Sequence, residues 1–172
     1  TFHGHSHYVM HLAFNPINSD IFASASLDGT VKVWKFGSPS PTLTLEGHTK
    51  GVNCVDYLLV DGQPHLLSGS DDFTIKVWDS DNVCLKTLEG HTNNVTSICA
   101  HPDLPLIIST SEDSTICTWE AKTYRLVNNF NYGFERVWTI GFRKGLNKVA
   151  FGCDNGMVMA KFTAEPTSVH QD

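Results

Sequence analysis

Serine, histidine and aspartate recur together three times in this chain, and these are the side chains that nucleophilic catalysis uses. In each set a tryptophan follows, six residues after the aspartate and ten residues after the serine. The sets are His5, Ser24, Asp28 and Trp34; His48, Ser68, Asp72 and Trp78; and His91, Ser109, Asp113 and Trp119. Repetition at structural positions favours buried hydrogen-bond networks, which run from indole through hydroxyl and imidazole to carboxylate. We therefore expect no catalytic residue and no enzyme.

The histidine of each set follows a glycine, and these Gly-His pairs are evenly spaced. Gly4, Gly47 and Gly90 lie 43 residues apart, and one further step reaches Gly133. A period in this range with Gly-His and Trp-Asp marks is typical of β-propeller blades, which are four-stranded sheets. We expect an all-β WD-repeat propeller with about four blades, in one domain over residues 1–172. The approximate repeats are 4–46, 47–89, 90–132 and 133–172.

The strands that must position these residues follow from alternating apolar patterns between turn residues. The expected inner strands are 8–14, 52–58, 95–100 and 137–142, and the second strands are 21–26, 65–70, 106–111 and 148–152. The third strand of the first repeat is expected at 30–34, and outer strands at 42–45, 85–88, 126–129 and near 167–169. The fourth repeat keeps Asp154 but has Phe134, Ala150 and Ala160 at the other network positions. We expect that blade to depend on packing alone.

Rings of this repeat type have about seven blades, because closing the ring hides the sheet edges. Four units leave two open faces. We therefore expect a piece of a longer protein, with the pairing of two copies through those faces as the alternative.

Composition narrows the class of protein. The chain has 172 residues, a net charge of −6, 17% charged and 41% hydrophobic residues. This acidic balance disfavours nucleic acid and suits a cationic partner. No apolar run approaches the roughly 18 residues of a membrane span, so we expect no membrane insertion. The five cysteines form no CxxC pair, which favours free thiols in a reducing cytosol; they are Cys54, Cys84, Cys99, Cys117 and Cys153.

The first segment offers a metal hypothesis as an alternative. His3, His5, His7 and His11 could supply imidazoles to zinc, copper or nickel. However, His5 already belongs to a network, and the segment holds no cysteine or carboxylate to complete a tetrahedral set. We expect neither a metal site nor a cofactor.

The amino-acid sequences of the repeats indicate a particular family more specifically than their period does. The stretches are FASASLD at 22–28, TVKVW at 30–34, GVNCVDY at 51–57, SDD at 70–72, KVWD at 76–79, HPDLPLII at 101–108 and SED at 111–113. The irregular fourth repeat adds TYRL at 123–126, NYG at 131–133, ERVW at 135–138, DNG at 154–156 and EP at 165–166. Together they resemble the later blades of the amino-terminal propeller in the coatomer β′ subunit family.

This resemblance implies a non-enzymatic subunit of the COPI coat, which serves Golgi-to-ER retrograde transport. In that family the propeller recognises membrane cargo tails that end in a dilysine motif with a free carboxylate. Asp71 matches a family acid that faces a cargo lysine, Tyr8 matches an aromatic beside the peptide, and Glu112 occupies the equivalent ring position. The implied partners are dilysine-tailed cargo and other coatomer subunits, on the cytoplasmic side of Golgi and COPI vesicle membranes.

The resemblance also implies that the peptide crosses the narrow top face of the propeller. Two kinds of position are expected to line it: Leu27, Asp71, Glu112 and Cys153 before the turn aspartates, and Tyr8, Met10, Gly51, Asn53, Asn94 and Thr96 after the Gly-His pairs. Asn53 and Asn94 are expected to bond loop backbone. The family's carboxylate-clamping basic residues and its other lysine-binding acids lie on earlier blades, so this chain alone should bind dilysine peptide very weakly or not at all.

A second class of function stays open. A generic WD-repeat scaffold, of the ubiquitin-ligase adaptor or histone-tail reader type, would use the same top-face positions for another peptide. Coat function requires the free terminal carboxylate beside the lysines, whereas a scaffold would be indifferent to it.

Overall fold

The protein is built from four antiparallel sheets that follow one another along the chain. The computed structural model describes residues 1–143, 145 and 147–162. Within these residues no helix could span a membrane. The strands are β1 (Val9–Phe14), β2 (Ile21–Ser26), β3 (Val31–Lys35), β4 (Leu43–Leu45), β5 (Val52–Val60), β6 (Gln63–Ser70), β7 (Ile75–Trp78), β8 (Cys84–Leu88), β9 (Val95–Ala100), β10 (Leu106–Ser111), β11 (Thr115–Glu120), β12 (Leu126–Asn131), β13 (Val137–Arg143), β14 (Lys148–Cys153) and β15 (Gly156–Lys161).

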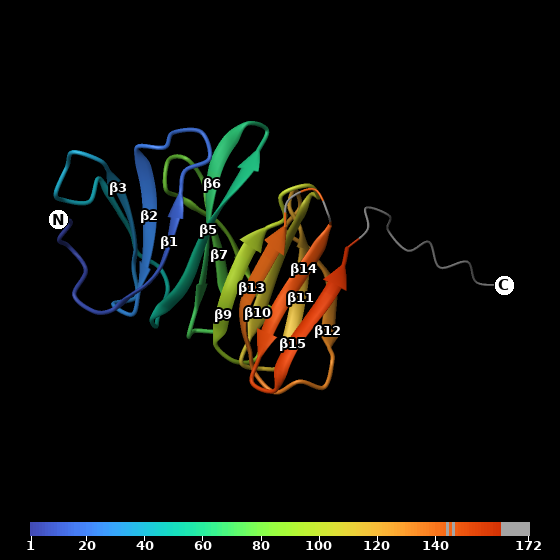
Figure 1. Ribbon diagram of the computed structural model, residues 1–172. Coiled ribbons are helices and arrows are strands. Elements are labelled where there is room, and N and C mark those ends of the chain that lie inside the picture. The colour runs from blue at the N-terminus through green and yellow to red at the C-terminus, as the bar shows by residue number, and fades with distance from the viewer. Residues whose placement is uncertain (144, 146, 163–172) are drawn as a thin grey trace.

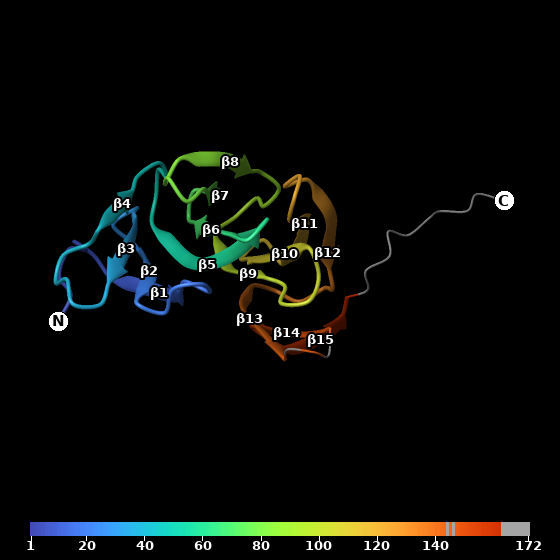
Figure 2. The same cartoon turned by 90° about the horizontal axis from the view of Figure 1, so that it is seen from above.

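The sheets stand side by side as blades in an arc (Figures 1 and 2). We number them blade 1 (β1–β4), blade 2 (β5–β8), blade 3 (β9–β12) and blade 4 (β13–β15). Seen from above, β1, β5, β9 and β13 line the concave side of the arc (Figure 2). The predicted all-β propeller with four blades is confirmed. The outer strand expected near 167–169 lies outside the described residues.

One predicted turn was too long. Residues 59–64 were left between the strands expected at 52–58 and 65–70, but Gln63 pairs with Val60 and Pro64 pairs with Leu59. The turn consists of Asp61 and Gly62 alone, with φ angles of 49° and 79°. A two-residue hairpin turn of type I′ has positive φ at both positions, which Asp-Gly supplies, so β6 begins at Gln63 and not at residue 65 as expected.

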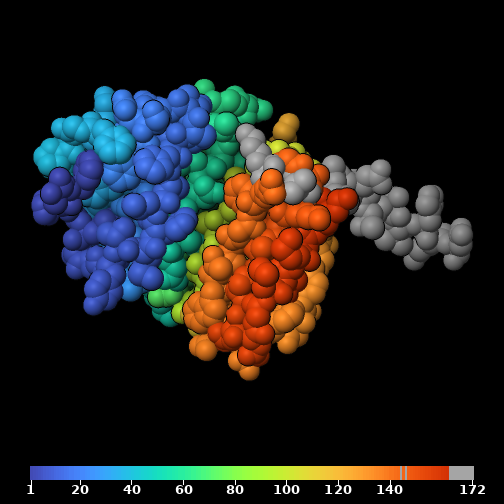
Figure 3. Space-filling model, in the orientation of Figure 1, coloured from blue at the N-terminus to red at the C-terminus, as the bar shows by residue number. Residues whose placement is uncertain are grey.

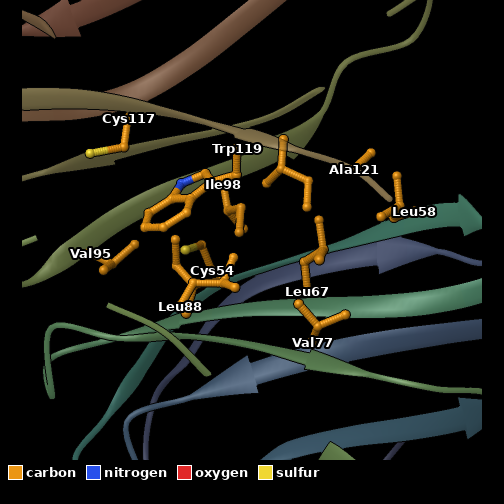
Figure 4. Packing of buried hydrophobic residues seen from close by; sticks show 12 residues of the cluster. Cys54, Leu58, Leu67, Val77, Leu88, Val95, Ile98, Cys117, Trp119 and Ala121 are labelled. Carbon is orange, nitrogen blue, oxygen red and sulfur yellow. The ribbon is translucent and has the colours of Figure 1, made fainter. Parts of the chain in front are cut away.

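Apolar side chains hold successive blades together. Between blades 2 and 3, Leu67 and Val77 from one sheet and Ile107 from the other are fully buried in one cluster. Figure 4 shows Leu67 and Val77 in this cluster with Trp119 of blade 3. Similar clusters join blade 1 to blade 2 and blade 3 to blade 4. In each of the first three blades, the indole of the network tryptophan also packs closely against the glycine of the Gly-His pair. A Cβ on Gly90, for example, would lie 2.9 Å from Cη2 of Trp119. This close approach explains why the histidine follows a glycine.

Polar contacts reinforce these interfaces at the inner strands. The Nδ1–H of His11 on β1 donates to the Val55 carbonyl on β5 at 2.9 Å. The backbone N–H of Ala100 on β9 donates to Oδ2 of Asp56 on β5 at 2.8 Å. Burial raises the pKa of this Asp56 carboxyl group. The inner strands are thus linked across blades by directional bonds as well as by packing.

Replacing Gly69 with alanine should destabilise the fold. A Cβ at this buried β6 position would lie 2.5 Å from Cγ1 of Val95 and 2.7 Å from Sγ of Cys54, and neither short side chain can swing away. We expect Gly69→Ala to lower the free energy of unfolding by about 1–3 kcal/mol, measured by urea denaturation.

Gly141→Ala on β13 is the matched control, since no described neighbour lies within 4 Å of that Cβ position. It should be neutral or stabilise by up to about 1 kcal/mol. Equal effects of the two changes would contradict close packing of blade 2 on blade 3.

Candidate functional site

A chain of hydrogen bonds connects the tryptophan, serine, histidine and aspartate of each of the first three blades. In blade 2, Nε1–H of Trp78 donates to Oγ of Ser68 at 2.9 Å, and Oγ lies 2.8 Å from Nε2 of His48. Nδ1 of His48 lies 2.8 Å from Oδ2 of Asp72. The corresponding distances are 2.8, 2.6 and 2.7 Å in blade 1 (Trp34, Ser24, His5, Asp28) and 2.9, 2.8 and 3.0 Å in blade 3 (Trp119, Ser109, His91, Asp113). The structure therefore brings all twelve residues into three networks.

The protons of the blade 2 network follow from its donors and acceptors. His48 donates Nδ1–H to Asp72, and its bare Nε2 accepts the Ser68 hydroxyl, whose oxygen accepts the indole proton. Burial lowers the pKa of His48, in keeping with this neutral imidazole. Burial alone would raise the pKa of Asp72, but hydrogen bonds from Thr74 and His48 outweigh it and lower the pKa to about 2.

The same geometry rules these serines out as nucleophiles. The Ser68 hydroxyl is fully buried and engages both His48 and Trp78. A catalytic serine must instead present its oxygen to a substrate. Ser24 and Ser109 are buried in the same way. The networks fasten the loop before each inner strand to the second and third strands of its blade.

Blade 4 has a polar tie of its own, so the expectation that it depends on packing alone was wrong. Asp154 accepts hydrogen bonds from Nε–H of Arg136 at 2.9 Å and from Nε1–H of Trp138. The Arg136 guanidinium also lies over the indole, 5.1 Å from the ring centroid. Here the turn carboxylate holds residues of the inner strand and of the segment before it, in place of a histidine.

A hollow of about 670 Å³ opens on the concave side of the arc. In the space-filling view, blade 1 in blue and blade 4 in orange and red stand apart, with blades 2 and 3 between them (Figure 3). The lining comes from all four blades and includes Met10, Leu27, Asn53, Asp71, Asn94, Thr96, Glu112 and Trp138. A volume of this size is in the usual range of ligand sites.

β-Bulges aim one residue of every inner strand into this hollow. The register shifts between Val9 and His11 in blade 1, and equivalent shifts occur in the other three blades. A bulge inserts one residue and re-aims its side chain. The four inserted residues are Met10, Asn53, Thr96 and Trp138, and all of them line the hollow.

The structure brings Asp71 and Glu112 together at the hollow. Nδ2 of Asn53 donates to Oδ1 of Asp71 at 2.7 Å, and Nδ2 of Asn94 donates to Oε1 of Glu112 at 3.0 Å. Asn53 also donates to the Val95 carbonyl at 3.0 Å. The expectation that both asparagines bond backbone was wrong for Asn94 and incomplete for Asn53, because each amide fixes a carboxylate.

Three of the expected lining residues lie elsewhere. Tyr8 is 74% exposed and packs against the ring of His7, outside the hollow. Gly51 and Cys153 are also absent from the lining. Positions counted from the Gly-His pairs missed Trp138. Val137 follows Val95 by 42 residues and not by the 43 residues of the period, so positions in the fourth repeat are displaced by one. Aligning the first inner-strand valines, rather than the glycines, would have found it.

The amino-terminal histidines do not converge. His5 bonds Ser24 and Asp28, His11 donates to Val55, and Nδ1 of His7 accepts the backbone N–H of Tyr8. Over residues 1–143, 145 and 147–162, no group of three or more His, Cys, Asp or Glu could hold a metal ion.

This fold and these networks define a class of protein. The chain matches the family described as WD domain, G-beta repeat, over residues 1–35, 39–79 and 82–120. It belongs to the WD-repeat family.

Comparison with curated proteins gives a narrower likeness. The chain is 55% identical to coatomer subunit beta'-1 of Arabidopsis thaliana over 95% of its length, and 51% identical to coatomer subunit beta' of Drosophila melanogaster over 99%. It is 44% identical to the probable coatomer subunit beta' of Schizosaccharomyces pombe over its whole length. The aligned region is 18%, 19% and 22% of these relatives, so the chain spans about a fifth of their length. The resemblance to coatomer β′ is confirmed.

Removing one network hydroxyl should destabilise its blade. In Ser68→Ala, Nε2 of His48 and the indole N–H of Trp78 both lose their buried partner. We expect the free energy of unfolding to fall by about 1–3 kcal/mol in urea denaturation. Ser80→Ala, at an exposed turn of the same blade, should change it by less than about 0.5 kcal/mol. An equally small effect at Ser68 would contradict the network's role.

Acid should weaken the fold through the same groups. Hydrogen bonds lower the pKa of Asp28, Asp72 and Asp113 below the unfolded value near 4, although burial opposes this. Their stabilisation is therefore present above about pH 4 and lost as the pH falls toward 2. The lowered pKa of His48 adds a loss that begins near pH 6.5, where the unfolded histidine takes up a proton.

Urea denaturation between pH 7 and pH 2.5 measures this dependence. Asp72→Asn should be less stable at pH 7 and show a shallower fall below pH 4, because one titrating group is gone. A variant curve parallel to the wild-type curve would show that Asp72 does not contribute.

Proposed function

We propose that this chain is part of a non-enzymatic subunit of the COPI coat, and that its hollow helps to recognise C-terminal dilysine tails of membrane cargo in Golgi-to-ER retrograde transport. The names of the curated relatives, coatomer subunit beta', support the coat assignment. In this proposal the partners are dilysine-tailed cargo and other coatomer subunits. The protein acts in the cytoplasm, peripherally on Golgi and COPI vesicle membranes.

The charge of the hollow carries this proposal. Asp71 from blade 2 and Glu112 from blade 3 line it, and its lining contains no lysine or arginine among the described residues. The amides of Asn53 and Asn94 hold the two carboxylates in place before any ligand arrives. Fixed carboxylates on neighbouring blades suit two ammonium groups on one short peptide.

These contacts alone are too weak for tight binding. An exposed lysine–carboxylate pair contributes about 0.2–1 kcal/mol, whereas micromolar affinity requires about 8 kcal/mol. The family resemblance implies further contacts to the terminal carboxylate from residues outside this chain. Tyr8, exposed at the margin of blade 1, would meet the peptide outside the hollow.

A titration with the longest natural polypeptide that contains this chain tests the proposal. The ligand is a peptide that ends in two nearby lysines and a free carboxylate. Its binding is measured by calorimetry or fluorescence anisotropy. We expect Asp71→Lys to weaken binding by about tenfold or more, since an ammonium group replaces the facing carboxylate. The C-terminal amide of the peptide should also bind more weakly.

Asp81→Lys is the matched control, because it makes the same change of charge at an exposed turn on the outer side of blade 2. It should bind like the wild type at physiological salt. Binding that ignores both the amide and Asp71→Lys would favour the generic scaffold instead.

A further inference from the structure

The loop that joins β3 to β4 in blade 1 differs from its counterparts. It spans residues 36–42, whereas the corresponding loops of blades 2 and 3 are the shorter stretches 79–83 and 121–125. Those two loops contain no proline, and the first closes with a backbone bond from Asp79 to Val83 at 3.0 Å. The blade 1 loop has the sequence FGSPSPT and holds the only two Ser-Pro pairs of the chain. Since two neighbouring blades close without them, the blade architecture does not require these prolines.

The second serine of the loop is open to solvent. Ser40 is exposed, and among the described residues its hydroxyl makes no hydrogen bond. The hydroxyl of Ser38 is instead half-buried and donates to the Ser40 carbonyl at 3.1 Å. The loop lies at the outer side of blade 1 beside the amino terminus (Figure 1), and none of its residues lines the hollow. Another protein can therefore reach Ser40 without touching that surface.

This exposure does not depend on the open face of blade 1. Blade 2 is flanked by blades on both sides, yet Ser80, Asp81 and Val83 of its corresponding loop are exposed as well. The loop between third and outer strands lies at the end of a blade and not on the face that stacks. A further blade packed on blade 1 would leave Ser40 accessible.

A serine followed by proline is the acceptor that one class of protein kinase selects. Proline has no N–H and a fixed φ, and it keeps the preceding residue out of the helical conformation. In the transfer, Oγ of Ser40 attacks the γ-phosphorus of Mg²⁺-bound ATP. The bond from that phosphorus to the β,γ-bridging oxygen breaks, ADP leaves with the electron pair, and the hydroxyl proton passes to an aspartate of the kinase.

Two contacts tie the middle of the loop to the amino-terminal segment. The N–H of His3 donates to the Pro39 carbonyl at 3.1 Å, and a Cβ on Gly4 would lie 3.2 Å from Cδ of Pro41. The strand that follows, β4, has only three residues and forms the edge of its sheet. Short segments with few buried contacts open locally at small cost in free energy. The stretch around Ser40 can therefore become extended in a kinase cleft while β1, β2 and β3 stay paired.

We infer that Ser40 is a phosphorylation site for a proline-directed serine kinase. Ser40 is the acceptor rather than Ser38, because its hydroxyl is exposed and makes no competing bond. The phosphate adds about 1.5–2 negative charges to the outer side of blade 1. The inference is independent of the proposed function, since it concerns a surface away from the hollow.

A kinase assay on the polypeptide used for the titration above tests the inference. The polypeptide is incubated with Mg²⁺-ATP and a purified mitogen-activated protein kinase, and mass spectrometry locates and counts the phosphate. We expect phosphate on Ser40, and Pro41→Ala should slow its incorporation there about tenfold or more, although the acceptor hydroxyl remains. Ser38→Ala is the matched control and should leave Ser40 phosphorylated at a similar rate.

A synthetic peptide of residues 33–46 separates access from sequence recognition. If Ser40 of the folded polypeptide stays unmodified, the inference is overturned, and the peptide then shows whether access or recognition failed. Phosphate on Ser38 instead, or an unchanged rate in Pro41→Ala, would also overturn it. The polypeptide purified from its own cells should carry the same phosphate, and its absence from Ser40 there would count equally against the site.

Discussion

A small antiparallel sheet cannot bury both of its faces by itself, and the whole molecule depends on how this is solved. Blades 2 and 3 each press one face on the preceding blade and the other on the next, so that Leu67, Val77 and Ile107 lose all contact with water between them. Removing such side chains from water contributes roughly 1.5–3 kcal/mol each. The stacking is directional, because the sheets twist and form an arc with their inner strands on the concave side (Figure 2). The hollow is a consequence of this curvature.

The buried networks play a different part from the packing. They connect a loop at the end of each blade to the strands beneath it, and they leave no group in the chain from Trp78 to Asp72 without a partner. A fully satisfied network in a low-dielectric interior is rigid, because any displacement leaves a buried polar group unpaired. Rigid loops matter here because the residue before each network aspartate (Leu27, Asp71 or Glu112) lines the hollow. The residues that resemble a catalytic set are therefore structural, and they help to fix where the neighbouring carboxylates lie.

The predictable part of this protein is the part that repeats. The period, the turn residues and the alternation of strands indicated four blades, since each of these signals reflects local geometry. The partners of Asp71 and Glu112 were not predictable in the same way, because Asn53 and Asn94 reach them across a sheet whose register the sequence does not state. The bulges were missed for a related reason: no residue type marks them, and they appear only when inner and second strands are paired. Trp138 was missed because the count began from a Gly-His pair that the fourth repeat lacks.

The fourth repeat shows how a loss of pattern can change a site. Without a histidine to hold, Asp154 is free to accept hydrogen bonds from Arg136 and Trp138, the latter at the bulge. In blades 2 and 3 the bulge residues Asn53 and Thr96 are short, and both bond a carbonyl of the next blade. In blade 4 the bulge residue is Trp138, which has a large aromatic ring. Asp154 holds this ring in place by accepting a hydrogen bond from its indole N–H. The divergent blade therefore replaces the network of the other three blades with hydrogen bonds of its own, and it places a half-exposed indole in the lining of the hollow.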